Sequence, residues 1–215
     1  MKKTFIAMFG IVLLSSNAFA GGTTGFGVGA KVGTLGLGIE AVKPISNNLD
    51  LRLGVNQFDY DANETLDGVD YTATLNMQTV SALADFRPMN NGFFVSGGVM
   101  QNGNELNATA TVTAAEPVTI GTDTLTSGVV TSGVSFDDVS PYVGIGYRQP
   151  ASVKPGWTFT ADAGVLLQGD PKITLTESTN TVSQADIDAE IANVRDDVDA
   201  LKTLPVVAIG AVYNF

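Results

Sequence analysis

The best candidates for chemistry are eight charged residues that fall within segments of alternating large apolar and small or polar residues. The period-two pattern places all eight on the face opposite the large apolar side chains. Four are basic and four are acidic: Lys31, Arg52, Arg87, Arg148, Glu40, Asp50, Asp85 and Asp162. A buried charge is costly unless it is paired and hydrogen-bonded. A balanced set therefore predicts a packed network of ion pairs inside the fold before it predicts an open pore.

Glu40 and Arg52 form the most specific of the predicted ion pairs. If they lie opposite each other on neighbouring strands, the apolar residues on either side of them also meet apolar residues. The same reasoning on the next pair of strands predicts that Asp85 lies opposite Ser96.

The composition excludes several kinds of active site. The chain has no histidine, so Ser-His and Cys-His catalytic pairs are impossible and the commonest metal ligand is missing. Asp59, Asp61 and Asn63 have the spacing of calcium-loop ligands, but Glu64 occupies the position where that loop needs glycine. We therefore expect no enzymatic activity, no catalytic residue, no metal and no cofactor. The formal net charge of −11 argues against nucleic acid as a partner.

The start of the sequence has the pattern of an export signal. Lys2 and Lys3 precede an apolar run, and Ala18-Phe19-Ala20 has the small-x-small pattern of a cleavage site. We expect residues 1–20 to be a cleaved signal peptide and residues 21–215 to form one domain. No apolar run reaches the roughly 18 residues that a membrane-spanning helix needs. If this chain resides in a membrane, it must do so as a barrel.

Eight segments alternate with period two, and the connections between them are sorted by length. The predicted strands are 25–32, 35–42, 49–60, 71–87, 93–100, 139–148, 157–168 and 205–215. Connections after the second, fourth and sixth strands are short, whereas those after the third, fifth and seventh are long, as in outer-membrane barrels. These features predict an all-β fold, an eight-stranded antiparallel transmembrane up-and-down β-barrel that is a monomer.

Two details of this prediction concern irregular segments. The apolar phase of the fourth strand changes near Gln78 and Thr79, which predicts a β-bulge there. Residues 102–136 are rich in small polar residues and are expected to form a long external loop with a protruding hairpin.

The last external loop is expected to contain an amphipathic helix from Ile187 to Leu201. Ser183 can cap it, and Ile191, Val194 and Val198 continue the apolar stripe at helical spacing. We expect the stripe to pack on the barrel rim; a role in binding is the alternative.

The final strand resembles the terminal strand of bacterial outer-membrane barrels. Its apolar face carries Val207, Ile209, Ala211, Tyr213 and Phe215. This resemblance implies an assembly signal that the barrel-assembly machinery reads, and a location in the lipid of a Gram-negative outer membrane. An ordinary last strand of a soluble periplasmic β-protein is the alternative.

Three motifs resemble the carbapenem-associated outer-membrane protein (CarO) family. They are Gly33-Thr34-x-Gly36-x-Gly38, Pro141-Tyr142-x-Gly144-x-Gly146, and Gly169-Asp170-Pro171-Lys172 with Thr174-Leu175-Thr176 before an acidic helix. The resemblance implies an eight-stranded outer-membrane barrel proposed to admit small basic amino acids such as ornithine. The chain differs from the closest members in ending on Phe215, where they end on Trp, and in the composition of its long external loop.

Two functions follow from these patterns. One is a small, slow channel for cationic small solutes, such as basic amino acids, because the external segments are acidic. The other is a non-conducting structural or surface-interaction barrel, because an eight-stranded barrel is narrow enough for side chains to fill.

Overall fold

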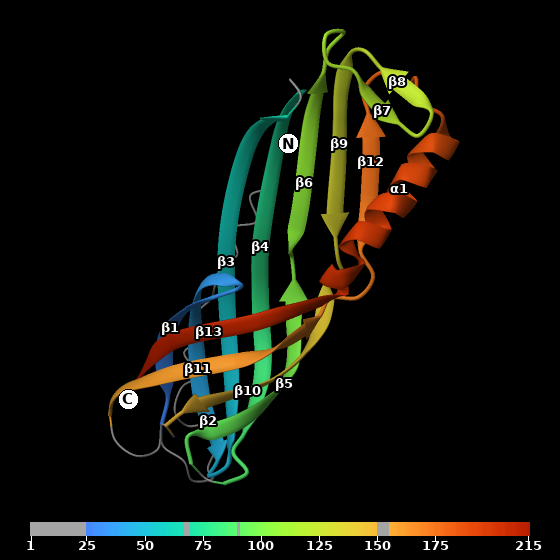
Figure 1. Ribbon diagram of the computed structural model, residues 1–215. Helices are drawn as coiled ribbons and strands as arrows, with labels where there is room; N and C mark the ends of the chain where they lie inside the picture. Colours follow the sequence, from blue (N-terminus) through green and yellow to red (C-terminus); the bar gives the residue numbers. More distant parts are fainter. Residues whose placement is uncertain (1–24, 67–68, 90, 150–154) are drawn as a thin grey trace.

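An eight-stranded antiparallel ring forms one end of the molecule (Figure 1). The computed structural model describes residues 25–66, 69–89, 91–149 and 155–215. The expected signal peptide lies outside these residues. The ring consists of β1 (Gly27–Gly33), β2 (Gly36–Ser46), β3 (Leu49–Leu66), β4 (Val69–Phe86), β5 (Phe93–Asn102), β10 (Val139–Arg148), β11 (Gly156–Leu167) and β13 (Thr203–Asn214). The pairing of β1 with both β2 and β13 closes the ring, and the predicted fold class is confirmed.

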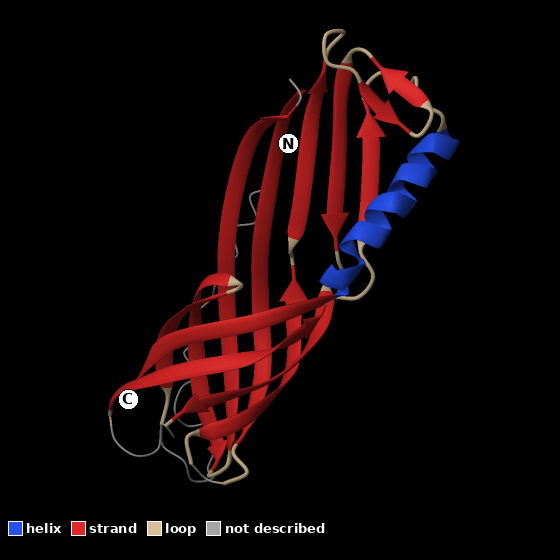
Figure 2. Ribbon diagram, viewed as in Figure 1, coloured by secondary structure: helices blue, strands red, loops and turns tan. Residues whose placement is uncertain are grey.

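Strands β3 and β4 continue beyond the ring as one unbroken ladder (Figure 2). Beside their distal halves, three further strands extend the same sheet from β4. A short hairpin, a helix and a 3-10 turn complete this end of the molecule. These elements are β6 (Glu105–Val112), β9 (Gly128–Ser135), β12 (Lys172–Glu177), β7 (Val118–Ile120), β8 (Asp123–Leu125), α1 (Gln184–Val198) and η1 (Asp199–Lys202). We call this part the distal module and its five-stranded portion the distal sheet.

The distal sheet corrects two sequence-based expectations. Residues 102–136 are not mainly loop, because β6 pairs with the distal half of β4 and β9 pairs with β6. The expected bulge near Gln78 and Thr79 is also wrong, because the β3–β4 register runs without a shift from Leu49 opposite Phe86 to Leu66 opposite Val69. At Gln78 it is the other neighbour of β4 that changes, from β5 to β6.

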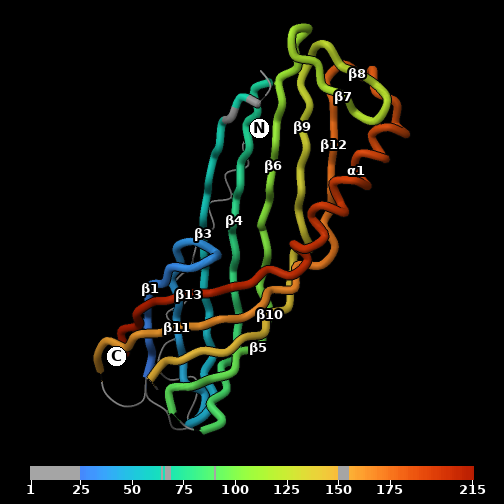
Figure 3. Tube along the Cα trace, viewed as in Figure 1, coloured from blue at the N-terminus to red at the C-terminus, as the bar shows by residue number. Residues whose placement is uncertain are grey.

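The helix α1 lies along β12 at the edge of the distal sheet (Figure 3). It begins three residues before the expected Ile187, and the expected last residue, Leu201, lies in η1. Ser183 caps it, since its hydroxyl accepts a hydrogen bond from the Asp186 amide. The apolar stripe is half-buried against β12 and β7, so it packs on the distal module and not on the barrel rim. No helix in the described part of the chain is long and apolar enough to cross a membrane.

The Asp186 carboxylate also ties α1 to the β7–β8 hairpin. It accepts hydrogen bonds from the Ser183 hydroxyl, at 2.6 Å, and from the Thr122 amide, at 2.9 Å. These hydrogen bonds, that from Ser183 above all, hold the pKa of Asp186 below its ordinary value. Beneath the hairpin lies a small apolar core that includes Val69, Ile120 and Leu125.

Candidate functional site

The ring places all eight predicted charged residues in its lumen. Period-two alternation on β1–β4, β10 and β11, continued one residue past β4 at Arg87, aims them inward while their large apolar neighbours point out. None of the eight has more than 7% of its side chain exposed. Because the set contains four cations and four anions, the lumen has no net formal charge.

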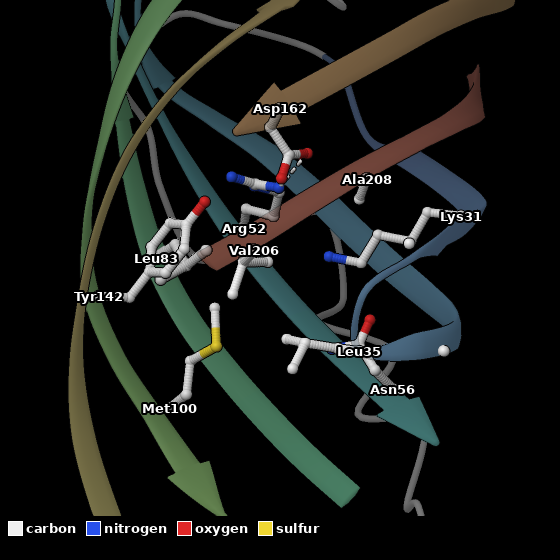
Figure 4. A pocket seen from close by; sticks show the side chains of 12 residues that line it. Lys31, Leu35, Arg52, Asn56, Leu83, Met100, Tyr142, Asp162, Val206 and Ala208 are labelled. Atoms are coloured by element: carbon white, nitrogen blue, oxygen red, sulfur yellow. Dashed lines mark hydrogen bonds and ion pairs between the residues drawn. The ribbon is translucent and has the colours of Figure 1, made fainter. Parts of the chain in front are cut away.

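Arg52 lies at the centre of one half of the network, and Figure 4 shows it beside one of its partners, Asp162. Its Nε lies 3.0 Å from Asp85 Oδ2, and its Nη1 lies 3.1 Å from Asp162 Oδ1 and 3.6 Å from Glu40 Oε2. Glu40 also pairs with Lys31, at 3.5 Å. One guanidinium therefore faces three carboxylates that come from three different strands.

The expected ion pair between Glu40 and Arg52 is present, but the strand register that led to it is wrong. Glu40 lies opposite Gly54, and Val42 lies opposite Arg52, two residues from the predicted register. A one-residue register shift between Pro44 and Ser46 at the end of β2 brings Glu40 opposite Gly54; without it, Glu40 would lie opposite Val55. The pair survives because a two-residue shift keeps every side chain on its face. The predicted placement of Asp85 opposite Ser96 is confirmed.

Arg148 joins the other half of the network to the first. Its Nη2 lies 2.7 Å from Asp85 Oδ2 and 3.1 Å from Asp50 Oδ2. Asp50 in turn pairs with Arg87 at 2.5 Å. The eight residues thus form one connected set of ion pairs, and Ser96 adds a hydroxyl that donates a hydrogen bond to Asp85.

Phe94 is the central lumenal residue that the sequence analysis did not identify. The guanidinium carbons of Arg148, Arg52 and Arg87 lie 4.9, 5.5 and 5.7 Å from the centre of its ring, within cation–π range. Its neighbour across the ladder is Gly146, where a Cβ atom would collide with the ring. A glycine opposite an inward aromatic residue is the sequence signal that could have indicated this position.

An apolar layer closes the lumen on the side of the distal module. It comprises Leu35, Leu83, Met100, Tyr142, Leu166 and Val206, all of them buried. Between this layer and Arg52 lies a pocket of about 10 Å³ (Figure 4), about enough for one water molecule. The charge network and the apolar layer together fill the barrel.

The outer wall of the ring is apolar. Exposed side chains cover the faces of all eight strands, and they include Val28, Ile39, Leu53, Val80, Val99, Ile145, Phe159 and Ile209. In water such a surface would drive association. A continuous apolar wall around a closed antiparallel ring is the arrangement that lipid requires.

Two crystal structures of CarO proteins from Acinetobacter baumannii match this chain. CarO superposes with a TM-score of 0.57 and 23% sequence identity over 88% of this chain and 97% of that one. CarO2 gives a TM-score of 0.61 and 21% identity over 91% of this chain and all of that one. This chain has the CarO fold. At these identities the similarity concerns the fold alone. No family model and no curated protein sequence matches the chain.

The terminal strand of this CarO-like barrel presents its predicted signal face outward. Val207, Ile209, Ala211, Tyr213 and Phe215 alternate with buried or half-buried residues along β13. The aromatic ring of Tyr213 packs edge-on against those of Trp157 and Phe215, and Phe26 stacks on Phe215. These rings form an aromatic cluster at the rim where the first and last strands meet.

The residues with calcium-like spacing do not form a loop. Asp59, Asp61 and Asn63 lie on β3, where alternation puts them on one exposed face of an extended strand. A calcium loop wraps its ligands around the ion, and an extended strand cannot do so.

Proposed function

We propose that this protein is an outer-membrane barrel that does not conduct solutes in the observed state and that holds its distal module outside the membrane. The observation that carries the proposal is the filled lumen. Four cations and four anions neutralise one another there, and an apolar layer lies above them. A solute would have to break several buried ion pairs to pass, and each broken pair costs several kcal/mol.

Planar-bilayer recording tests the closed barrel. Purified protein inserted into a bilayer should give no resolved conductance steps, whereas a general porin in the same bilayer provides the positive control. Regular steps from the wild-type protein would refute the proposal.

A slow channel for cationic small solutes such as basic amino acids is the second candidate. The distribution of acidic residues favours it. Every acidic residue outside the lumenal network falls within residues 59–70, 105–138 or 170–199, which belong to the distal module and its connections. The resulting negative field would concentrate cations at that end of the barrel. Liposomes that contain the protein should then swell faster in ornithine than in glutamate, and an absence of swelling in both would remove this candidate.

The same proposal assigns a role to the terminal strand. The barrel would reside as a monomer in outer-membrane lipid after export by the signal peptide, and the barrel-assembly machinery would read the outward face that ends at Phe215. Deletion of Phe215 should reduce the amount of folded barrel in the membrane, measured as the heat-dependent mobility shift on a gel. Unchanged assembly would remove the role of Phe215. We assign the barrel no catalytic activity.

A further inference from the structure

One face of the distal sheet is an array of hydroxyl and amide side chains. The β-sheet register aligns one row across all five strands: Asn63, Thr72, Thr109, Thr131 and Thr176. The next row towards the barrel begins with the carboxylate of Asp61 and continues with Thr74, Asn107, Gly133 and Thr174. Neighbouring strands are about 4.8 Å apart, so the side chains of each row are regularly spaced. We call these two rows the hydroxyl face.

Much of the hydrogen-bonding capacity of this face is unused. Thr72 donates to Asn63 at 2.9 Å, but among the described residues the hydroxyls of Thr109, Thr131 and Thr176 have no partner. At Gly133 the side chains of two neighbours lie close over the backbone, because an added Cβ atom would lie 2.8 Å from Thr174 Oγ1 and 3.0 Å from Asn107 Oδ1. The hydroxyl can donate and accept hydrogen bonds, and the amide oxygen can accept them.

The hydroxyl face is continuous with the lipid-facing wall of the barrel. The outward residues of β3 run from Leu51 and Leu53 to Asp59, Asp61 and Asn63 without a break in register. In Figure 1 the strands β3 and β4 rise directly from the ring into the distal sheet. The molecules beside this face are therefore the parts of membrane lipids that project from the leaflet touching the wall.

Charge selects among such head groups. The carboxylate of Asp61 lies within the hydroxyl face, and those of Asp59 and Glu105 lie in the row below it, with Lys172 at the far end of that row. The negative charge of these carboxylates disfavours phosphates and other anions close to the sheet. A grid of hydroxyls and amides matches the alternating donors and acceptors of uncharged sugars.

We propose that the hydroxyl face binds the neutral oligosaccharide of a glycolipid in the surrounding membrane leaflet. The inference rests on the barrel being seated in a membrane, as proposed above. A barrel seated in the membrane would place the hydroxyl face next to the sugars of neighbouring glycolipids.

Threonine-methyl NMR in nanodiscs tests the proposal. One set of discs contains lipid A together with a glycolipid whose oligosaccharide is uncharged, and the other contains lipid A alone. The methyl signals of Thr72, Thr109 and Thr131 should differ between the two discs. Those of Thr119 and Thr124, which are exposed on the β7–β8 hairpin and bond to each other, should not. Identical signals for the three sheet threonines would overturn the proposal.

Variants provide the second arm of the test. The triple variant T72V/T109V/T131V removes three hydroxyls but keeps the β-branched shape that strands favour. Its affinity for the soluble neutral oligosaccharide, titrated into lipid A discs, should fall about tenfold, which corresponds to about 1.4 kcal/mol. The control variant T119V/T124V should bind like the wild type. Undiminished binding by the triple variant would contradict the proposal, whereas a conductance step would contradict only the closed barrel.

Discussion

Strands β3 and β4 run through two regions that place their apolar side chains on opposite faces. Within the barrel, β3 aims Asp50 and Arg52 inward and Leu51 outward. Beyond the barrel, the inward face of β3 carries Phe58 and Tyr60, which stay exposed, and that of β4 carries the half-buried Tyr71, Leu75 and Met77. The outward faces there carry polar residues. The ladder itself does not change phase.

The difference between the two regions follows from what surrounds each face. In the membrane setting proposed above, the outer wall of the barrel meets lipid and its interior holds paired charges. The outer face of the distal sheet is exposed, and the β7–β8 hairpin packs on part of its inner face. An apolar side chain goes to whichever side excludes water. A change of apolar phase along a strand can therefore mark the edge of a membrane as well as a bulge.

The largest effect should come from removing a cation from the lumen. Arg52→Met leaves Glu40, Asp85 and Asp162 short of a partner and should cost roughly 3–5 kcal/mol of unfolding free energy. Urea titration in detergent, followed by the fluorescence of the single Trp157, measures it. The matched variant in the distal module is Lys172→Met. Lys172 pairs with Asp137 at 3.1 Å with over half of each side chain exposed, so it should cost at most about 1 kcal/mol. Equal losses of unfolding free energy in Arg52→Met and Lys172→Met would contradict the inference that charges are more strongly coupled in the lumen than in the distal module.

A second comparison places one charge on the outward face of β3 in each region. Leu51→Arg puts a guanidinium against lipid and should cost roughly 2–4 kcal/mol. Asn63→Arg, on the same face of the same strand, should change stability by no more than about 0.5 kcal/mol. Refolding equilibria in lipid vesicles measure both variants. A tolerated Leu51→Arg would show that lipid does not reach this wall.

Within the lumen, substitutions of Asp85 and of Glu40, two carboxylates that pair with Arg52, should lower the unfolding free energy by different amounts. Asp85 accepts hydrogen bonds from Arg52, Arg148 and Ser96, whereas Glu40 has ion-pair partners but no hydrogen bond. Asp85→Asn should therefore cost roughly 3 kcal/mol, and Glu40→Gln about 1 kcal/mol. The midpoints of urea unfolding at constant slope give both values. The reverse order would mean that the hydrogen-bond geometry does not set the strength of the network.

The smallest effect concerns the contact between α1 and the β7–β8 hairpin. Because the folded-state pKa of Asp186 lies below its ordinary value of 3.8, ionised Asp186 stabilises the fold above that pH. This contribution should disappear as the pH falls through the lowered value. Amide exchange in α1 should be slower in the wild type than in Asp186→Asn at pH 7, and equal in the two below that value. A difference that persisted in acid would exclude the carboxylate as its source.

The sequence predicted the ring well because strand alternation is local. Side chains on successive residues of a strand point to opposite faces, so the lumenal position of residues such as Arg52 and Asp162 followed from their own neighbours. The capping role of Ser183 was predictable for the same reason, since the contact spans three residues. The distal sheet was missed because its strands pair across long stretches of chain, as β12 does with β9.

The sequence by itself determined which residues form the eight strands of the ring and which face of each strand carries charge, since both depend on covalent geometry and nearest neighbours. Only the tertiary structure decided which charges pair, because pairing depends on register, on the shift at Pro44 and on closure of the ring. It also decided that Phe94 lies among three arginines. The tertiary structure also showed that residues 105–135 contain strands that pair beside the distal half of β4. A strand edge has unpaired backbone groups, and local sequence does not say which segment will pair with them.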